Sequence, residues 1–403
     1  MLRRDAGAVL SLLLAVAAAR ESWVRYPASG AIDFYQFWAV AQAAGEVRDP
    51  YSPEARGSLA RIPLDASPSQ REVGQRRPVL ETYSTPLLYA VFRAISSGDY
   101  DLDYLIYHLL SLACTAAAVL GLCVLFGWSA ATALLALSAL LLFASPFASD
   151  SVVGNVNQLQ LAGLASLIAL MHREKAVASG AVAALLVLFK PNLVAAEALL
   201  LVALLAHGRL RFAARHLAGA AGAAAVGIAA SSALFGNAAI WARWAGALAS
   251  MEHELELPAG SGNLSLARLL PGKAAPLAGV ALAALALAAL WRGRRHPWSD
   301  ETVLAAIGGG IAVMLLGSAL AWEHYFLLAT PAVLFLLRPA AMPRLFAAGS
   351  AAATLLWLLP SLTSLDHPLL LAFELGAGAA TLLAACVAML QGVEGIGASG
   401  GPL

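Results

Sequence analysis

The residues best suited to chemistry are a few ionisable and amide side chains that stand inside long apolar stretches. Such groups are costly at membrane depth unless they are paired, so each one is a candidate for a functional role. Asp33 opens the apolar segment DFYQFWAVAQAAG. The others lie in SPFASDSVVGNVNQLQ, FKPN, SGNLSLARLL and AWEHYF, and they are Asp150, Asn155, Asn157, Gln158, Lys190, Asn263, Arg268, Glu323 and His324.

These residue types fit the transfer of a group to a hydroxyl. A carboxylate such as Asp33 can take the hydroxyl proton, while Lys190, His324 and Arg268 can stabilise a negatively charged leaving group. Signatures of soluble enzymes, such as a P-loop, HExxH or GxSxG, do not occur in the sequence. No local cluster of carboxylates suggests a metal site, so we predict neither a metal nor a cofactor.

Each candidate also has a structural alternative, which the sequence leaves open. Asp33 could cap a helix, and Lys190 could extend from a helix end to the membrane interface. The amides of Asn155, Asn157 and Gln158 could join neighbouring helices by hydrogen bonds. Other polar groups are predicted to be solvated or structural: Arg71, Arg76, Arg77, His108, His172 and His207.

The segment that carries Asp33 is predicted to form a short helix. Its aromatic and apolar residues recur at helical spacing, and Asp33 and Gln36 have the spacing of a capping box. The stripe consists of Phe34, Phe37, Trp38 and Ala41. A helix of this kind beside a membrane segment is expected to lie in the interface. Asp33 would then meet a lipid-borne substrate at the membrane surface.

The composition indicates an integral membrane protein. Of the 403 residues, 60% are hydrophobic and only 12% are charged, whereas soluble domains carry roughly 25% charged residues. The net charge of +1 gives no field that would attract nucleic acid. Cys114, Cys123 and Cys386 all stand in apolar runs and are interpreted as core residues.

The apolar runs predict an all-α bundle of about twelve transmembrane helices. They lie near residues 6–20, 104–126, 129–147, 157–171, 176–189, 193–206, 217–235, 275–291, 302–320, 325–337, 345–360 and 368–390. Several runs are shorter than the roughly 20 residues of a perpendicular span. The pairs of runs around Lys190 and around His324 could therefore be re-entrant.

Basic residues in alternate short loops predict the orientation, because such loops remain in the cytoplasm. These residues are Arg3, Arg4, Arg173, Lys175, Arg209, Arg211, Arg215, Arg292, Arg294, Arg295, Arg338 and Arg344. The N-terminus is then cytoplasmic, and every candidate functional group emerges on the outer face. The first run also resembles a signal peptide, and cleavage would leave the following loop outside as well.

Residues 1–391 are predicted to form a single polytopic membrane domain followed by a flexible tail, 392–403. Its largest polar segment is an outer loop over 21–103, and a second outer loop covers 236–273. Within the first loop, Ser52 and Pro53 indicate a helix start. Residues 61–79 are predicted to be exposed coil, and Tyr83-Ser84-Thr85-Pro86 leads into the apolar LLYAVF.

An ordered series of motifs resembles glycosyltransferase family 87 (the DUF2029 group), which includes polyprenol-phosphate-mannose-dependent mannosyltransferases. The series is DFYQFWAVAQAAG, DPYS, YSTPLL, GNVNQLQL, FKPN, GNLSLARLL and AWEHYFLLATPAVLFLL. Two positions depart from the family pattern. Asn155 stands where glutamine is commoner, and Tyr325 replaces a histidine that often follows WEH.

The resemblance implies a GT-C fold, in which a helix bundle carries a large first outer loop with interfacial helices. It implies a sugar transferase that uses a polyprenyl-phosphate sugar, with mannose as the default, and an envelope glycolipid or glycan as acceptor. The enzyme would work at the bacterial cytoplasmic membrane, with its site facing outward. Asp33 maps onto the catalytic base of the family. Lys190, His324 and Arg268 would bind the donor phosphate.

Further substrate contacts are expected from Glu323, Asn155, Asn157, Gln158, Asn263, Tyr83 and Trp322. A single base without a carboxylate nucleophile favours inversion at the anomeric carbon. Two alternatives remain open: a transporter or flippase of lipid-linked sugars, and a non-catalytic scaffold that binds polyprenyl lipids.

Overall fold

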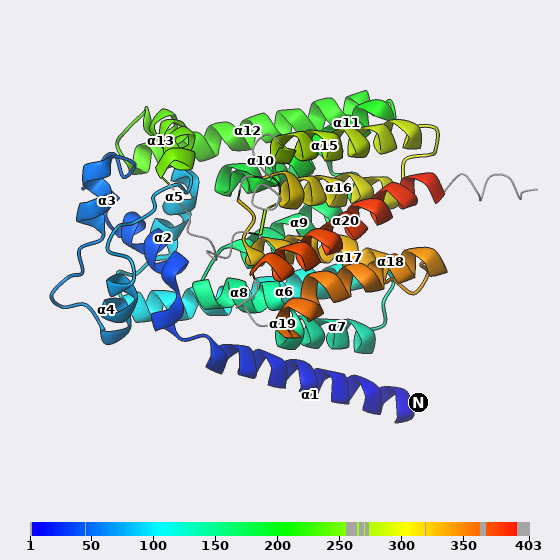
Figure 1. The fold of residues 1–403 in the computed structure, drawn as a ribbon, viewed down its shortest axis with the longest axis horizontal. Helices are drawn as coiled ribbons and strands as arrows, with labels where there is room; N and C mark the ends of the chain where they lie inside the picture. Colours follow the sequence, from blue (N-terminus) through cyan, green and yellow to red (C-terminus); the bar gives the residue numbers. More distant parts are fainter. Residues whose placement is uncertain are drawn as a thin grey trace, which may run out of the picture.

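The computed structural model describes residues 2–44, 46–254, 264–265, 270, 274–318, 320–362 and 368–392. These residues form helices joined by turns (Figure 1), which confirms the all-α prediction. Asn263 and Arg268, two of the predicted substrate contacts, lie outside the described residues. So do the end of the second outer loop and all of the predicted tail except Gly392.

The larger part of the structure is a bundle of helices, the longer of which run roughly side by side (Figure 1). They are α1 (Leu2–Arg25), α6 (Tyr100–Leu125), α7 (Ala130–Phe143), α8 (Ser145–Val153), α9 (Asn157–His172), α10 (Ala176–Phe189), α11 (Val194–Ala206), α12 (Leu210–Leu234), α15 (Ala274–Gly293), α16 (Asp300–Gly317), α17 (Thr330–Leu336), α18 (Pro343–Ala353), α19 (Leu359–Leu362) and α20 (Pro368–Gly392). Short turns complete the bundle: the 3-10 helices η2 (Pro191–Leu193) and η3 (Glu323–Ala329), and the π-helical turn η4 (Thr354–Leu358).

A second layer of shorter helices covers one end of the bundle, on the left in Figure 1. It contains η1 (Ala28–Gly30), α2 (Ile32–Gln42), α3 (Pro53–Leu59), α4 (Pro68–Gln75), α5 (Pro86–Ile95) and α13 (Ile240–Glu254). Both predicted outer loops therefore meet in this layer. It has a hydrophobic core of its own, in which aromatic residues of α2 and α5 pack against the start of α6.

Every apolar run of the sequence coincides with a helix or a pair of short helices, but twelve spans are not confirmed. By length and composition, four of the described helices can cross a membrane, or five if α7 and α8 form one span bent by 60°. The α10 and α11 helices have 14 and 13 residues. At 1.5 Å per residue each is about 20 Å long, shorter than a hydrocarbon core of about 30 Å.

Helix starts in the second layer follow local capping signals. The Ser52 side chain caps α3 with Pro53 in the first turn, as predicted, and Thr85 caps α5 in the same way. The prediction of coil is wrong over residues 68–75, where α4 forms with the Ser67 side chain as its cap, whereas residues 61–67 and 76–79 lie outside any helix. Several prolines in this stretch suggested coil, yet Pro68 occupies a first-turn position that needs no backbone donor.

Candidate functional site

Asp33 lies in the first turn of α2, not at its cap. The helix begins at Ile32, and its cap residue, Ala31, makes no side-chain hydrogen bond. The structural alternative for Asp33, that it caps this helix, is therefore wrong. Gln36 does not close a capping box either, since its side-chain oxygen accepts from the backbone amide of Glu81 at 2.9 Å. The predicted aromatic stripe is buried, together with Tyr35 and Val40.

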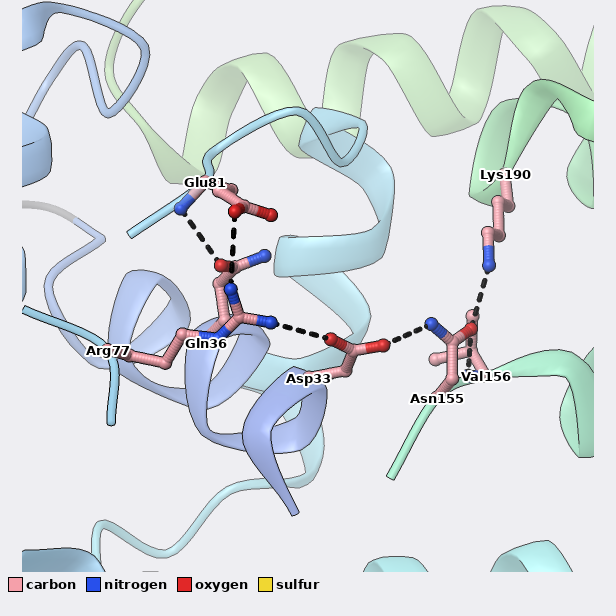
Figure 2. Close-up of polar contacts among 7 residues, drawn as sticks. All are labelled: Asp33, Gln36, Arg77, Glu81, Asn155, Val156 and Lys190. Carbon is pink, nitrogen blue, oxygen red and sulfur yellow. Dashed lines mark hydrogen bonds and ion pairs between the residues drawn. The ribbon is translucent and has the colours of Figure 1, made fainter. Parts of the chain in front are cut away.

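The Asp33 carboxylate is held between two groups that come from other elements (Figure 2). Asn155 donates from Nδ2 to Asp33 Oδ2 at 2.6 Å. On the other side, Arg77 Nη2 lies 3.6 Å from Asp33 Oδ1. The Asp33 side chain is 18% exposed, so the protein does not enclose it completely.

Sequence reasoning missed Arg77, which was assigned to a solvated face. The Arg77 side chain is 21% exposed, and its guanidinium also pairs with Glu81 at 3.2 Å. Neighbouring Arg76 matches the prediction, since it is 52% exposed and pairs with Glu72 within α4. Arg77 reaches Asp33 and Arg76 does not because of the way residues 21–103 fold, and no local signal in the sequence distinguishes the two arginines.

Asn155 joins Asp33 to Lys190, as Figure 2 shows. Lys190 Nζ donates to Asn155 Oδ1 at 2.7 Å. The same amine lies 4.3 Å from the centre of the Tyr325 ring, a cation–π contact. The amine is thus held against protein groups, and Tyr325, one of the two departures from the family pattern, forms part of its surroundings.

The backbone at Lys190 is extended because of the following proline. Pro191 disfavours helical geometry for the residue before it, so α10 ends at Phe189 and Lys190 adopts φ −154° and ψ 115°. Hydrogen bonds from two other elements fix this turn. Thr85, the cap of α5, donates from Oγ1 to the Phe189 carbonyl at 3.0 Å, and Gln160 of α9 donates from Nε2 to Asn192 Oδ1 at 2.9 Å. A rigid turn therefore presents the amine.

Gly154 brings Asn155 to Asp33. It ends α8 in the left-handed region, with φ +68°. A Cβ atom there would lie 2.8 Å from the Phe34 Cβ and 3.1 Å from the Ala31 Cβ. The turn between α8 and α9 thus touches the start of α2 at a point that only glycine fits.

Burial raises the pKa of Asp33 above its ordinary value of 3.8. The Asn155 hydrogen bond and the charges of Arg77 and Lys190 oppose this shift without reversing it. A carboxyl group with a raised pKa is a stronger base than an ordinary aspartate. These surroundings therefore suit proton removal near neutral pH.

The remaining amides of this region differ in their surroundings. Asn157 Nδ2 donates to Asp150 Oδ1 at 2.8 Å, and both side chains are fully buried. Among the described residues, Asp150 Oδ2 and Asn157 Oδ1 have no hydrogen-bond partner. Gln158 instead accepts from Thr115 at 3.0 Å and donates to Ser151 at 3.1 Å. Its contacts are those of an interhelical link between α6, α8 and α9.

Glu323 and His324 do not form a pair with each other in the described structure. Ser145 donates its hydroxyl to the Glu323 carboxylate. His324 is buried, and its Nε2 has no hydrogen-bond partner among the described residues. The His324 ring contacts the Tyr325 ring at 4.9 Å between centroids. His324 is therefore next to the aromatic ring that holds the Lys190 amine, with one nitrogen available.

The two predicted aromatic contacts have different surroundings. The Tyr83 ring is covered by the Arg56 guanidinium at 4.9 Å, and its carbonyl accepts from Trp244 of α13. Trp322 immediately precedes η3, and its carbonyl accepts from the amide of Tyr325, whose ring faces Lys190, at 2.9 Å. No group of three or more His, Cys, Asp or Glu side chains in the described ranges is arranged to hold a metal ion.

An apolar groove of about 500 Å³ begins beside the Lys190 turn. It lies between α11, α15 and α16 and is lined by Pro191, Asn192, Val194, Ala195, Gly279, Val280, Ala283, Val313, Met314, Gly317, Ser318 and Leu320. Asn192 connects the groove to the site, and its side-chain nitrogen is buried without a partner among the described residues.

The fold and the site define a multi-pass membrane protein with an ionisable centre at one end of its helix bundle. Comparison with protein families then gives its class: the model of glycosyltransferase family 87 matches residues 82–321. The chain belongs to this family and is a membrane glycosyltransferase. Comparison with curated proteins finds no match, and neither does comparison with solved structures. Asp33 precedes the matched region, so the family match does not include this residue.

Proposed function

We propose that this glycosyltransferase moves a sugar, with mannose the first choice, from a polyprenyl phosphate to a hydroxyl of an envelope glycolipid or glycan. The observation that carries the proposal is the connected series Arg77, Asp33, Asn155 and Lys190, which sets a base beside a cation. The reaction takes place on the outer face of a bacterial cytoplasmic membrane, with the N-terminus inside. Residues 1–391 act as one polytopic domain.

Asp33 is the proposed general base. It takes the proton of the acceptor hydroxyl as that oxygen attacks the anomeric carbon, and the bond from this carbon to the phosphate oxygen breaks. Its 18% exposure leaves one side open to an acceptor. Asp33 acts as a base and forms no bond to the sugar, so the single displacement inverts the configuration at the anomeric carbon.

Lys190 is the proposed partner of the leaving phosphate. A phosphate monoester leaves readily without a proton, but the charge that develops on it needs a cation or hydrogen-bond donors. The Lys190 amine supplies a positive charge, and His324 Nε2 is a further group that lacks a partner among the described residues. Asn157 and Glu323 are proposed to contact the sugar, while Gln158 links the neighbouring helices. The sequence also proposes substrate contacts from Arg268, Asn263, Tyr83 and Trp322.

A lipid donor is favoured by the apolar groove that begins at Pro191 and Asn192, immediately after Lys190. A hydrocarbon chain in this groove would place its phosphate end near the amine. A nucleotide sugar would have no use for an apolar surface of this kind. The groove therefore supports a polyprenyl phosphate as the donor class.

The direct test is transfer by purified protein in detergent, with a polyprenyl-phosphate mannose and a glycolipid acceptor. The proposal predicts a mannosylated acceptor and free polyprenyl phosphate, with no membrane gradient present. Transfer from a nucleotide sugar but not from the lipid-linked sugar would overturn the donor assignment. Donor binding without transfer to any of a panel of envelope acceptors would favour a transporter or flippase.

A further inference from the structure

A second cavity lies beside the connection between α1 and α2, away from the groove next to Lys190. Its volume is about 450 Å³. It is lined by Trp23, Val24, Tyr26, Pro27, Ala28, Asp101, Tyr104, Leu105 and His108. The lining comes from the end of α1, from η1 and from the first turns of α6. None of these residues belongs to the proposed catalytic arrangement.

Aromatic rings make up much of the cavity wall. The His108 ring lies 5.1 Å from the Trp23 ring and stacks on Tyr104 at 5.8 Å. Aromatic faces carry negative electrostatic potential, and several of them around one space attract a cation. Trp23 remains 39% exposed, so this wall is open to a ligand.

The charge of the cavity points to the same class of ligand. Among the lining residues that the structure describes, Asp101 is the one acidic side chain, and none is lysine or arginine. A carboxylate beside aromatic faces favours an ammonium group over a phosphate or a carboxylate.

One buried polar atom in the cavity wall has no partner. His108 is 3% exposed, and its Nε2 lacks a hydrogen bond within the part of the chain that the structure describes. Sequence analysis predicted this histidine to be structural or solvated, yet it is buried with an unused nitrogen. Tryptophan and tyrosine often anchor a protein at the membrane interface, but anchoring alone does not account for the His108 nitrogen. An ammonium ligand would supply the missing donor.

The surface next to the cavity carries exposed apolar side chains. An ammonium ligand that binds here is therefore expected to be the headgroup of a lipid. Leu105 and Leu109 are 37% and 54% exposed and lie four residues apart on one stripe of α6. At the other side of the cavity Val24 of α1 is 64% exposed. A lipid whose headgroup occupies the cavity can lay its acyl chains along these side chains.

We propose that this cavity binds the ammonium headgroup of a zwitterionic phospholipid. The ammonium group sits against Trp23 and Tyr104, with one N–H directed to Asp101 and another to His108 Nε2. The acyl chains follow the exposed leucines of α6. Since η1 forms part of the wall, the bound lipid would hold the connection that leads into α2. The proposal does not depend on the sugar donor or on any role of Asp33.

Native mass spectrometry of the full-length protein in detergent tests this site. The delipidated protein is titrated with phosphatidylethanolamine and with phosphatidylglycerol of the same acyl chains. The wild type is expected to bind the ethanolamine lipid about tenfold more tightly. Asp101→Asn and Trp23→Leu should each abolish this preference. Glu54→Gln, which removes the same charge from an exposed position in α3, should preserve it.

Equal binding of the two lipids by the wild type would overturn the proposal, and so would an unchanged preference in both cavity variants. Tighter binding of a glycosyl diacylglycerol with the same chains would assign the cavity to a sugar instead. If Asp101→Asn does not fold, Trp23→Leu decides alone, because that side chain is partly exposed at the end of α1.

Discussion

Burial and three neighbours together set the ionisation of Asp33, which in the proposed mechanism determines how the enzyme responds to pH. Burial raises the pKa of Asp33, while Asn155, Arg77 and Lys190 lower it. A base must be deprotonated to act, so activity should be lost as the pH falls through this raised pKa. The acid limb of kcat/KM should therefore lie above 3.8, the ordinary value for an aspartate.

Removing the Arg77 charge should raise the pKa of Asp33 further, because a positive charge favours the carboxylate form. In Arg77→Gln we expect the acid limb to move to higher pH by up to about one unit. Arg76→Gln is the matched control, since that side chain pairs only with Glu72 and is 52% exposed. The measurement is kcat/KM against pH for all three proteins. If the acid limb of kcat/KM lies at the same pH in the wild type and in both variants, the ionisation of Asp33 does not determine that limb.

Lys190 should matter most in the transition state, when charge develops on the departing phosphate. Loss of one such charge-stabilising group typically lowers kcat by about 10²–10³. We expect that loss in Lys190→Met, with a smaller change in the KM for the donor. Lys175→Met provides the control, because Lys175 is exposed at the start of α10, away from the site. A normal kcat in Lys190→Met would remove the amine from the mechanism.

At the scale of elements, the site depends on the contact between the α8–α9 turn and α2. Gly154→Ala should separate these elements, since its Cβ would meet Phe34 and Ala31. We expect a loss of stability of about 1–3 kcal/mol and a fall in kcat, as Asn155 moves away from Asp33. Thermal unfolding in detergent and the transfer assay measure the two effects.

Gly127→Ala separates strain from contact in this test. Gly127 has a similar φ of +77°, but nothing lies within 4 Å of the added Cβ. It should lower stability by about 1 kcal/mol and leave kcat unchanged. If both variants lose activity equally, backbone strain rather than the α2 contact is responsible.

Local signals in the sequence predicted many of these elements. Apolar runs gave the helices of the bundle, and the Ser52-Pro53 pair predicted the start of α3. The start of α5 carries the same kind of signal at Thr85 and Pro86, which the sequence analysis did not use. The same signal marks α4 at Ser67, but the density of prolines around it favoured coil. The capping-box spacing of Asp33 and Gln36 correctly predicted a helix start, although both side chains bond to other elements instead of capping the helix.

The assembly of the site could be predicted only in outline. Alternation of loops predicted that Asp33, Asn155 and Lys190 emerge on one face, and the structure brings them into contact. The pairing itself joins residues 122 positions apart, which no local pattern encodes. Arg77 was missed for the same reason. It reaches Asp33 because α4 packs against η1 and α2.

At the scale of the whole molecule, the orientation in the membrane is open to direct measurement. Ser58 is exposed in α3 at the outer layer, and Arg295 is exposed in the turn between α15 and α16. Starting from Cys114→Ala, we expect a membrane-impermeant maleimide to label Ser58→Cys in intact cells. Arg295→Cys should be labelled only after permeabilisation. The opposite pattern would reverse the orientation and place the site in the cytoplasm.

The proposed mechanism depends on Asp33 as the base that activates the acceptor hydroxyl. The Asp33→Asn variant keeps the shape of the side chain, and it also removes a buried charge, so its unfolding temperature should not fall. With donor binding intact, its single-turnover transfer rate should drop by about 10²–10⁴. Wild-type turnover in this variant, at any pH, would contradict the mechanism proposed for this site.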